Sequence, residues 1–412
     1  MNIWLTLVLG IILFSLALEL FVSYLNLGAL TPELPKEFEG IYNKDEYRKS
    51  QDYTKATTRF GIFENCISTS ITVIFLVLGG FNWLDTLARQ FGYNAIVTGL
   101  IFTACLGLLS FITGMPFSIY STFVIEERFG FNKTTAKTFI LDIIKGSLLA
   151  IALGGPLLAL VFWFFETTGT YAWVYCWVGI VAFSVLMQFI APIFIMPLFN
   201  KFTPLEPGEL KDKINLYSTK EKFQLSGIFT MDGSKRSTKL NAFFTGFGKF
   251  RKIVFFDTIV EELTADEIVS VLAHEMGHYK LKHIVKMMLI STLQTGFMFF
   301  LLSLFLKFPE ISQGFLLEHT SIYASLIIFG FLYSPISLFT SIGINSLSRK
   351  HEFQADAYAA TTTGESKHLI TSLKKLSRAN LSNLTPHPVH VFLHYSHPPL
   401  LERIEQLLTV KK

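Results

Sequence analysis

The sequence predicts a mainly α-helical membrane protein with seven transmembrane helices and a small water-facing region that contains β-strands. Hydrophobic residues make up 51% of the 412 residues, and charged residues make up only 16%. A soluble domain carries about 25% charged residues, so most of this chain is suited to a lipid bilayer rather than to water. The formal net charge of +4 is too small to indicate a nucleic-acid partner.

Seven stretches are apolar and long enough to cross the hydrocarbon core, which takes about 20 residues of helix. The expected spans are 3–27, 61–84, 94–117, 141–165, 172–199, 285–307 and 321–347. The chain then divides into a part with five spans at 1–199, a polar region at 200–284, two further spans within 285–347 and a tail at 348–412.

Lysine and arginine residues gather on one side of the predicted membrane. The loops 28–60 and 118–140, the polar region 200–284 and the tail 348–412 are rich in them, whereas the opposite connections hold few. Because basic segments are retained in the cytoplasm, the sequence predicts a cytoplasmic C-terminus and an N-terminus outside the cell or in a lumen. A bacterial inner membrane and the endoplasmic reticulum both fit this orientation.

The polar region is predicted to hold a small antiparallel sheet and then a helix. Three short β-rich runs are separated by turn residues, and they are Gly227–Met231, Leu240–Phe244 and Lys252–Phe256. Thr264 and Glu267 then form a capping box, a pattern that starts a helix.

The helix after this capping box carries His274-Glu-Met-Gly-His278, a match to the pattern H-E-x-x-H. Residues four apart share one face of a helix, so both imidazoles can reach one metal ion. Glu275 lies beside the first histidine and can address a water on that ion. Gly277 is small and lets another element approach closely. The pentapeptide alone leaves open a helix with two structural histidines.

A carboxylate ligand is available just after the last span. Glu352 and Asp356 lie four residues apart, so a helix places both carboxylates on one face. Glu352 can then bind zinc while Asp356 accepts a hydrogen bond from a ligand histidine. The pentapeptide ends shortly before the sixth span and Glu352 follows the seventh, so both halves of the ligand set reach the same face of the membrane.

The sequence therefore predicts one zinc ion per chain, held by His274, His278 and Glu352, with a fourth position open to water. Zinc lowers the pKa of its water, and Glu275 can take the proton during attack on a peptide carbonyl. The predicted function is a membrane-embedded zinc metalloendopeptidase. The remaining histidines, His283 and His351 among them, are expected at loops or helix ends rather than as ligands. The three cysteines lie far apart and suit neither a metal site nor a disulfide framework.

Several longer motifs resemble the type I CaaX prenyl endopeptidases, which are integral-membrane zinc proteases that cleave prenylated proteins. The motifs are Pro116–Lys133, Pro197–Leu205, Gly233–Ser237, Asn241–Gly246, His274–His278, Glu352–Asp356, Ser396–Pro399 and Glu402–Ile404. The resemblance implies seven transmembrane helices around a large internal chamber, with a zincin-like sheet and the zinc site near the cytoplasmic end. It also implies a peptide or a prenylated CaaX protein as the substrate.

The same resemblance implies roles for further residues. Asn241 and His397 are expected to grip the substrate backbone or the developing oxyanion, and Arg403 is expected to be a nearby supporting charge. The run Asn241–Phe244 is expected on an edge strand, where an extended substrate can add to the sheet. By pattern alone, Asn241 is an ordinary strand-turn residue and His397 is a solvent-facing loop residue. Tyr279 departs from the family, in which many relatives are expected to have tryptophan.

The sequence leaves three alternatives open. One is a bacterial quality-control protease of broader specificity, and another is an intramembrane protease of the site-2 type. The second of these buries its pentapeptide inside a span, whereas charged residues surround His274–His278 here. The third is a transporter or channel with a structural zinc, a kind of site that has four closed protein ligands and gives Glu275 no purpose.

Overall fold

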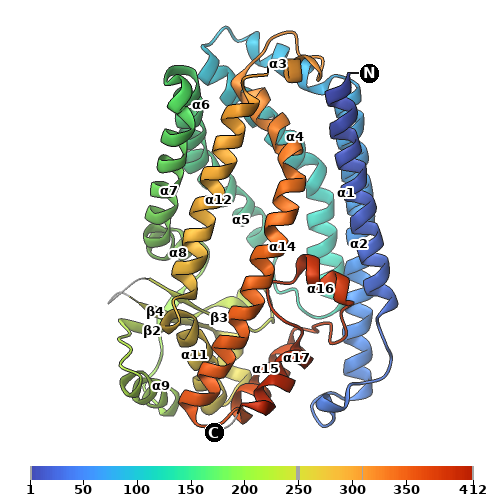
Figure 1. Ribbon diagram of the computed structural model, residues 1–412. Helices are drawn as coiled ribbons and strands as arrows, with labels where there is room; N and C mark the ends of the chain where they lie inside the picture. Colours follow the sequence, from blue (N-terminus) through green and yellow to red (C-terminus); the bar gives the residue numbers. More distant parts are fainter. Residues whose placement is uncertain (1, 247–250, 309, 411–412) are drawn as a thin grey trace.

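The computed structural model describes residues 2–246, 251–308 and 310–410 (Figure 1). Within them, seven helical spans are long and apolar enough to cross a membrane, which confirms the predicted number. These spans are α1 (Ile3–Gly28), α2 (Lys44–Val77), α4 with a π-helical turn (Ala95–Glu126), α5 to α6 (Ala136–Thr167), a turn with α7 and α8 (Gly169–Phe199), α12 (His283–Phe305) and α14 (Ile322–Thr363). The component helices are α4 (Ala95–Tyr120), α5 (Ala136–Leu149), α6 (Gly155–Thr167), α7 (Ala172–Ile190) and α8 (Met196–Phe199).

The remaining helices are shorter. They are α3 (Gly80–Arg89), α9 (Glu209–Lys220), α10 (Asp257–Glu262), α11 (Ala265–Lys280), α13 (Glu310–Gln313), α15 (Lys367–Ala379), α16 (Pro388–His394) and α17 (Leu400–Thr409). In Figure 1, α9, α11, α15 and α17 gather at the lower end, and α3 lies at the opposite end together with the start of α1. The first helix therefore begins at the end away from the polar region.

The second and seventh spans extend furthest beyond the apolar stretches that predict them. The second span was expected at 61–84, but α2 begins at Lys44 and ends at Val77. Its polar first half was expected to be a loop, yet a complete capping box between Asn43 and Glu46 starts a helix there. Gly79, at φ 72°, then separates α2 from α3. Similarly, α14 continues in one helix beyond the expected end at residue 347.

The seven spans do not pack into a solid bundle. Between 0% and 28% of the most apolar window of each span is buried within the protein. Low burial on helices that also contact their neighbours is expected where helices surround an open space, and it fits the predicted internal chamber. In Figure 1, α12 and α14 run along the front between α6 and α7 on one side and α1 and α2 on the other.

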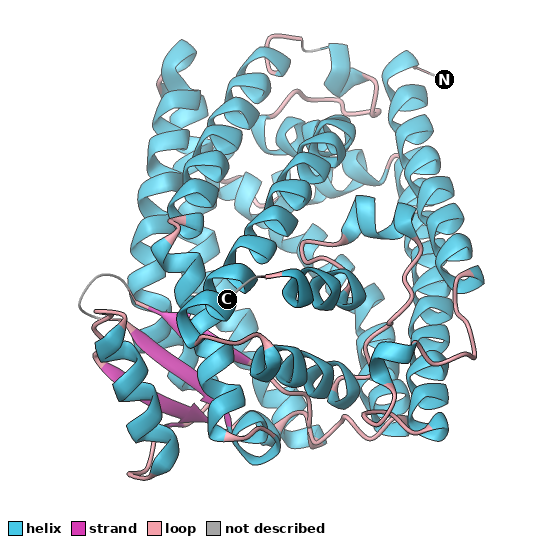
Figure 2. Ribbon diagram, turned by 60° about the horizontal axis from the view of Figure 1, so that its bottom comes forward, coloured by secondary structure: helices cyan, strands magenta, loops and turns pink. Residues whose placement is uncertain are grey.

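The sheet of the polar region is mixed, not antiparallel as predicted. Its strand order is β1-β2-β4-β3. The bounds are β1 (Phe202–Pro204), β2 (Gly227–Met231), β3 (Ala242–Thr245) and β4 (Lys252–Phe256). Strand β2 pairs with β4 in parallel, while β1 and β3 add in antiparallel fashion at the two edges. The prediction failed because β3, which comes between β2 and β4 in the chain, pairs outside them. Figure 2 shows the sheet, coloured magenta, at one side of the region.

Helix α11 forms the core of the polar region together with the sheet and α14. Its Ile268, Leu272 and Met276 are almost fully buried in one cluster with Phe255 of β4. On its other side α11 packs directly on α14, as the prediction for Gly277 requires. A Cβ atom on Gly277 would lie 3.0 Å from the Cα atom of Ala355, which is closer than real Cβ contacts allow without a shift. The absence of a side chain at Gly277 thus sets the distance between the two helices.

Substitution Gly277→Ala should push α11 and α14 apart and lower stability by roughly 1–3 kcal/mol, the usual cost of overpacking. The midpoint of thermal unfolding of the purified protein measures this effect. Gly343→Ala in α14 is the matched control, since a Cβ atom there meets nothing within 4 Å. An unchanged midpoint for Gly277→Ala would show that the helices are not held at this distance.

Candidate metal centre

Helices α11 and α14 bring the three predicted ligands together. Thr264 caps α11, and its capping box with Glu267 is complete, as predicted. His274 and His278 then project from one face of α11. Their Nε2 atoms lie 3.2 Å apart. Glu352 of α14 approaches both, with Oε2 at 3.3 Å from His274 Nε2 and Oε1 at 3.2 Å from His278 Nε2.

This donor set fits one metal ion. A tetrahedral ion with bonds of about 2.0–2.1 Å, which is the geometry of zinc, places its ligand atoms about 3.3 Å apart. The separations at the site are close to that value, with each histidine facing a different oxygen of Glu352. In addition, Oε2 of Glu352 is buried and makes no hydrogen bond within the described residues, although the Arg403 guanidinium lies 3.5 Å from it. A buried carboxylate oxygen is costly when it lacks a partner, so this atom suits a cation.

Asp356 and Arg403 support the first histidine. Asp356 Oδ1 lies 2.8 Å from His274 Nδ1, so the imidazole can donate a hydrogen bond to this carboxylate. Arg403 donates from Nε and Nη2 to the two oxygens of Asp356, at 2.8 and 2.7 Å. Burial disfavours the charged imidazole, but the carboxylates of Asp356 and Glu352 outweigh it and raise the pKa of His274 to about 9. The two carboxylates thus favour positive charge at this position.

His283 supports the second histidine, a role that the sequence did not predict. It begins α12, is 2% exposed, and places Nδ1 at 3.2 Å from His278 Nδ1. Its Nε2 lies 2.9 Å from the amide oxygen of Gln354. If His278 binds metal through Nε2, its Nδ1–H donates to His283, whose Nε2–H in turn donates to Gln354. One set of tautomers therefore satisfies all three side chains.

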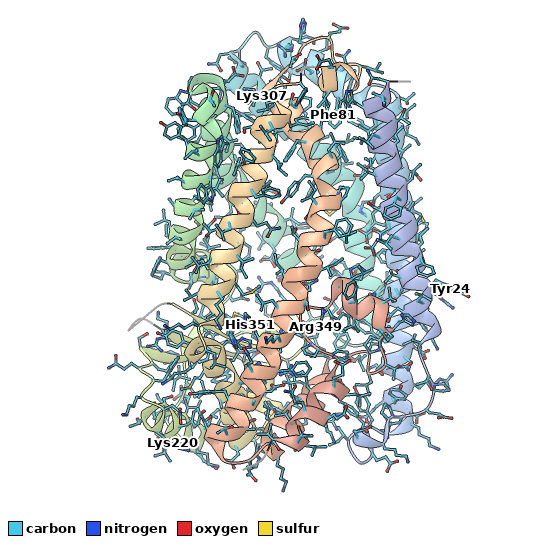
Figure 3. The ribbon with its side chains drawn as sticks, in the orientation of Figure 1. Tyr24, Phe81, Lys220, Lys307, Arg349 and His351 are labelled. Atoms are coloured by element: carbon cyan, nitrogen blue, oxygen red, sulfur yellow. The ribbon has the colours of Figure 1, made fainter. Side chains whose placement is uncertain are left out.

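The sequence gave little sign of this chain of hydrogen bonds. Positions 278 and 283 do not share a helix face, because α11 ends at Lys280 and Lys282 adopts a left-handed conformation at φ 58° before α12 begins. His351 stacks on His283, with ring centroids 4.0 Å apart and planes 8° apart. Figure 3 shows His351 on α14, where the spans meet the polar region. Only the presence of extra histidines beside both ligand segments hinted at the arrangement.

One cavity of about 670 Å³ is lined by two of the three predicted metal ligands and by all of the predicted catalytic residues. Its walls include Asn241, His274, Glu275, Glu352, His397 and Arg403. Glu275 is half-buried there. His397 has an exposed side chain, and its Nε2 lies 3.4 Å from Glu352 Oε1. Asn241 immediately precedes the edge strand β3, where the family resemblance placed it. The cavity therefore contains the metal ligands His274 and Glu352, the carboxylate of Glu275 and the start of the edge strand β3.

Comparisons with known proteins agree with this structure. Residues 23–201 match the family model for the CAAX prenyl protease N-terminal region of five membrane helices, and residues 204–411 match peptidase family M48. The CAAX prenyl protease 1 homolog of Arabidopsis thaliana is 36% identical, with 96% of each chain covered. CAAX prenyl protease 1 of Saccharomyces cerevisiae is 35% identical over 98% of this chain and 95% of its own. The crystal structure of Ste24p from S. mikatae matches with a TM-score of 0.92 and 35% identity over 99% of each chain.

The fold, the donor set and these matches define an integral-membrane metalloendopeptidase. The chain belongs to the CAAX prenyl protease 1 family, within peptidase family M48. The resemblance seen in the sequence is thus confirmed, and the alternative of a transporter or channel is wrong. The site-2 alternative also fails on geometry, since α11 carries the histidines and is not one of the seven spans.

Substitution His283→Leu should weaken metal binding by about 10- to 100-fold, the range for lost hydrogen bonds to ligand histidines. Competition between the protein and a zinc-binding dye measures this affinity without reference to activity. His283→Gln should restore part of the affinity, because its amide oxygen can accept from His278. His351→Leu is the control that removes the stacked ring alone. Equal affinity of His283→Leu and the unaltered protein would rule out the role of His283.

Proposed function

We propose that this protein is a zinc-dependent endopeptidase that hydrolyses a peptide bond near the C-terminus of prenylated CaaX proteins. The observation that carries the proposal is the convergence of three ligand side chains at one point, two of which line an open cavity together with Glu275. The ligands are His274, His278 and Glu352, with one zinc ion per chain. The substrate class is supported by the relatives, which are named CAAX prenyl proteases.

Zinc in this site supplies a Lewis acid that lowers the pKa of a water and polarises the scissile carbonyl. Glu275 follows His274 directly and faces the same cavity. Its carboxylate takes the proton of the attacking water and later delivers it to the leaving amide nitrogen. Arg403 donates a hydrogen bond to Asp356, and Asp356 accepts one from Nδ1 of His274. These contacts hold the imidazole ring of His274 in place. Arg403 thus positions a ligand and does not itself touch the reacting bond.

Two further side chains can hold the substrate. Ser396 Oγ lies 2.9 Å from His397 Nδ1 and fixes the ring, whose Nε2 can donate to the developing oxyanion. Asn241 uses its Oδ1 to accept from the amide of Ala242, which leaves Nδ2 as a donor for the substrate backbone. Strand β3 pairs with β4 on one side and ends the sheet on the other. An extended substrate can therefore add to β3 and lie across the ligands.

The site is proposed to face the cytoplasm. The polar end of the protein is formed by the loops 28–60 and 118–140, the region 200–284 and the tail 348–412. These four segments are the ones rich in lysine and arginine. The N-terminal start of α1 lies at the opposite end of the long helices (Figure 1). Cytoplasmic proteins with a lipidated C-terminus would reach the cavity from this side at the boundary between water and lipid.

Substitution Glu275→Gln should retain the metal but lower peptide hydrolysis by about 10²- to 10⁴-fold, the contribution of a general base. Metal content and turnover of a quenched peptide are measured on the same preparation. Glu261→Gln, on the exposed surface of α10, is the matched control. Near-normal turnover by Glu275→Gln would refute the proposed base.

Substrate class is tested with two peptides that end in the same C-a-a-X motif, one farnesylated and one unmodified. The farnesylated peptide should have the higher kcat/KM with the purified protein, and a chelator should abolish its cleavage. Equal kcat/KM values would contradict prenyl specificity and favour the protease of broader specificity. Failure to cleave either peptide in a zinc-loaded preparation would contradict the proposed function as a whole.

A further inference from the structure

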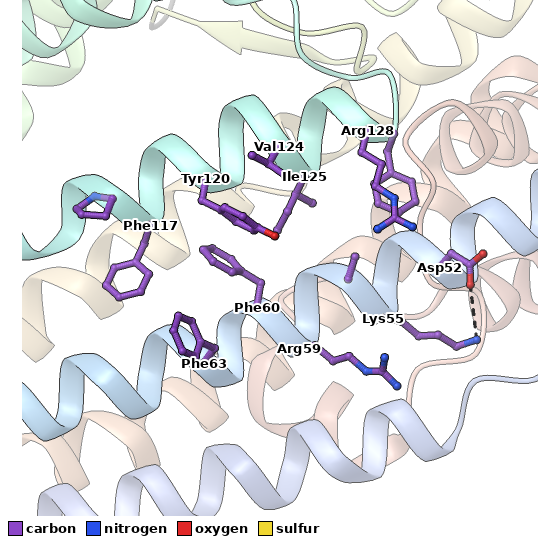
Figure 4. A pocket seen from close by; sticks show the side chains of 13 residues that line it. Asp52, Lys55, Arg59, Phe60, Phe63, Phe117, Tyr120, Val124, Ile125 and Arg128 are labelled. Carbon is purple, nitrogen blue, oxygen red and sulfur yellow. Dashed lines mark ion pairs between the residues drawn. The ribbon is translucent and has the colours of Figure 1, made fainter.

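A second cavity lies away from the metal centre, between α2 and the end of α4. It has a volume of about 840 Å³ and is open to its surroundings, and we call it the α2–α4 groove (Figure 4). Its walls are formed by Asp52, Lys55, Ala56, Arg59, Phe60, Phe63, Pro116, Phe117, Tyr120, Val124, Ile125, Arg128 and Phe129. None of these residues lines the cavity of the metal centre, so the proposed peptidase function does not account for the groove.

The groove has an aromatic half and a basic half. In Figure 4, Phe60 and Phe63 of α2 face Phe117 and Tyr120 of α4. Phe60 stacks on Tyr120, with ring centroids 4.9 Å apart, and lies 6.2 Å from the ring of Phe117. Farther along both helices, in the direction of the polar region, the walls become basic. Both walls change from apolar to charged residues toward the polar region, at Arg59 on α2 and at Arg128 beyond the end of α4, as expected where a membrane meets water.

The basic half has an excess of positive charge. Its cations are Lys55, Arg59 and Arg128, and its one carboxylate is Asp52, which lies 3.8 Å from Lys55. Within residues 2–246, 251–308 and 310–410, neither Arg59 nor Arg128 has an ion pair or a hydrogen bond from its side chain. The guanidinium of Arg128 lies only over the ring of Phe129, at 5.6 Å. Two guanidinium groups from different helices are thus available to an anion.

We propose that the α2–α4 groove binds an anionic phospholipid of the surrounding bilayer. Arg59 and Arg128 match a phosphate, because a guanidinium donates two parallel hydrogen bonds to such a group. An acyl chain then lies against Phe60, Phe63 and Phe117. Free phosphate would leave the aromatic half empty, and a zwitterionic headgroup would leave the excess positive charge uncompensated. The joined aromatic and basic halves therefore favour a whole anionic lipid.

The lipid would strengthen the contact between α2 and the end of α4. This contact includes a residue that lies close in the chain to the cavity of the metal centre. Beside the groove, Tyr53 of α2 donates to Glu126, which also accepts from Lys239 at 2.8 Å. Lys239 lies two residues before Asn241 in the chain. An anionic headgroup in contact with Arg128 and with the basic side chains of α2 would hold α2 against the end of α4 at this point. Bound lipid should therefore raise the thermal stability of the protein.

The test is lipid binding by the purified full-length protein in detergent, measured by native mass spectrometry and by the shift of the unfolding midpoint. Phosphatidylglycerol is compared with phosphatidylcholine of the same acyl chains. The anionic lipid should bind more tightly and give the larger shift. In Arg59→Gln/Arg128→Gln its affinity should fall by about 30-fold, as expected for two lost basic contacts. Lys44→Gln/Lys49→Gln, on the same helix outside the groove, is the charge-matched control and should bind normally.

A second pair of measurements separates a lipid site from other occupants. The double substitution Phe63→Ala/Phe117→Ala should lower the affinity for phosphatidylglycerol but leave the affinity for glycerol phosphate unchanged. Wild-type lipid affinity in Arg59→Gln/Arg128→Gln would overturn the proposal, as would equal shifts with glycerol phosphate and with the lipid. Displacement of the lipid by a farnesylated peptide, together with a raised KM in the arginine variant, would assign the groove to substrate instead. The unfolding midpoint of each variant without lipid confirms that it is folded.

Discussion

The close approach of α11 and α14 is the constraint on which the metal centre depends. Neither helix holds a complete ligand set, since two imidazoles come from α11 and the carboxylate comes from α14. The helices meet at Gly277 and Ala355, where a side chain on the glycine would lie 3.0 Å from the opposite backbone. One turn along α11 from this contact, His274 reaches Glu352. The separation of the helices thus fixes the separation of the ligands, and hydrophobic packing of α11 on the sheet holds that separation in place.

Electrostatics explains why so many charged groups can be buried at one point. Glu352 and Asp356 are 4% and 1% exposed, and a buried carboxylate needs a cationic partner. Arg403 supplies one positive charge, and its pKa is raised because Asp356 outweighs the effect of burial. A divalent ion would supply the rest. The two histidines differ in their outer partners, since Asp356 is charged whereas His283 accepts a hydrogen bond as a neutral ring. Asp356 therefore holds His274 through its negative charge. His283 holds His278 only by fixing the orientation of its ring.

Local patterns in the sequence predicted the parts of the structure that depend on local geometry. The capping box at Thr264, the shared helix face of His274 and His278 and the spacing of Glu352 from Asp356 all follow from helix periodicity. Long-range pairing was harder to predict. Strand β3 lies outside β2 and β4, and His283 meets His278 across a break between helices, so neither contact follows from spacing. The polar half of α2 was missed because hydropathy detects only the part of a helix that lies in lipid. Zinc binding by His274, His278 and Glu352 stays a prediction, as does the role of Glu275 as the base. The roles of Asn241, His397 and Arg403 stay predictions as well.

The central claim is that two imidazoles and one carboxylate hold a single zinc ion and leave one side open. X-ray absorption at the zinc edge, with metal analysis of the same purified sample, tests it most directly. The account predicts one zinc per chain with nitrogen and oxygen neighbours at about 2.0–2.1 Å, and loss of the ion in His274→Ala. Absence of stoichiometric zinc, sulfur in its shell, or an unchanged spectrum in His274→Ala would contradict it.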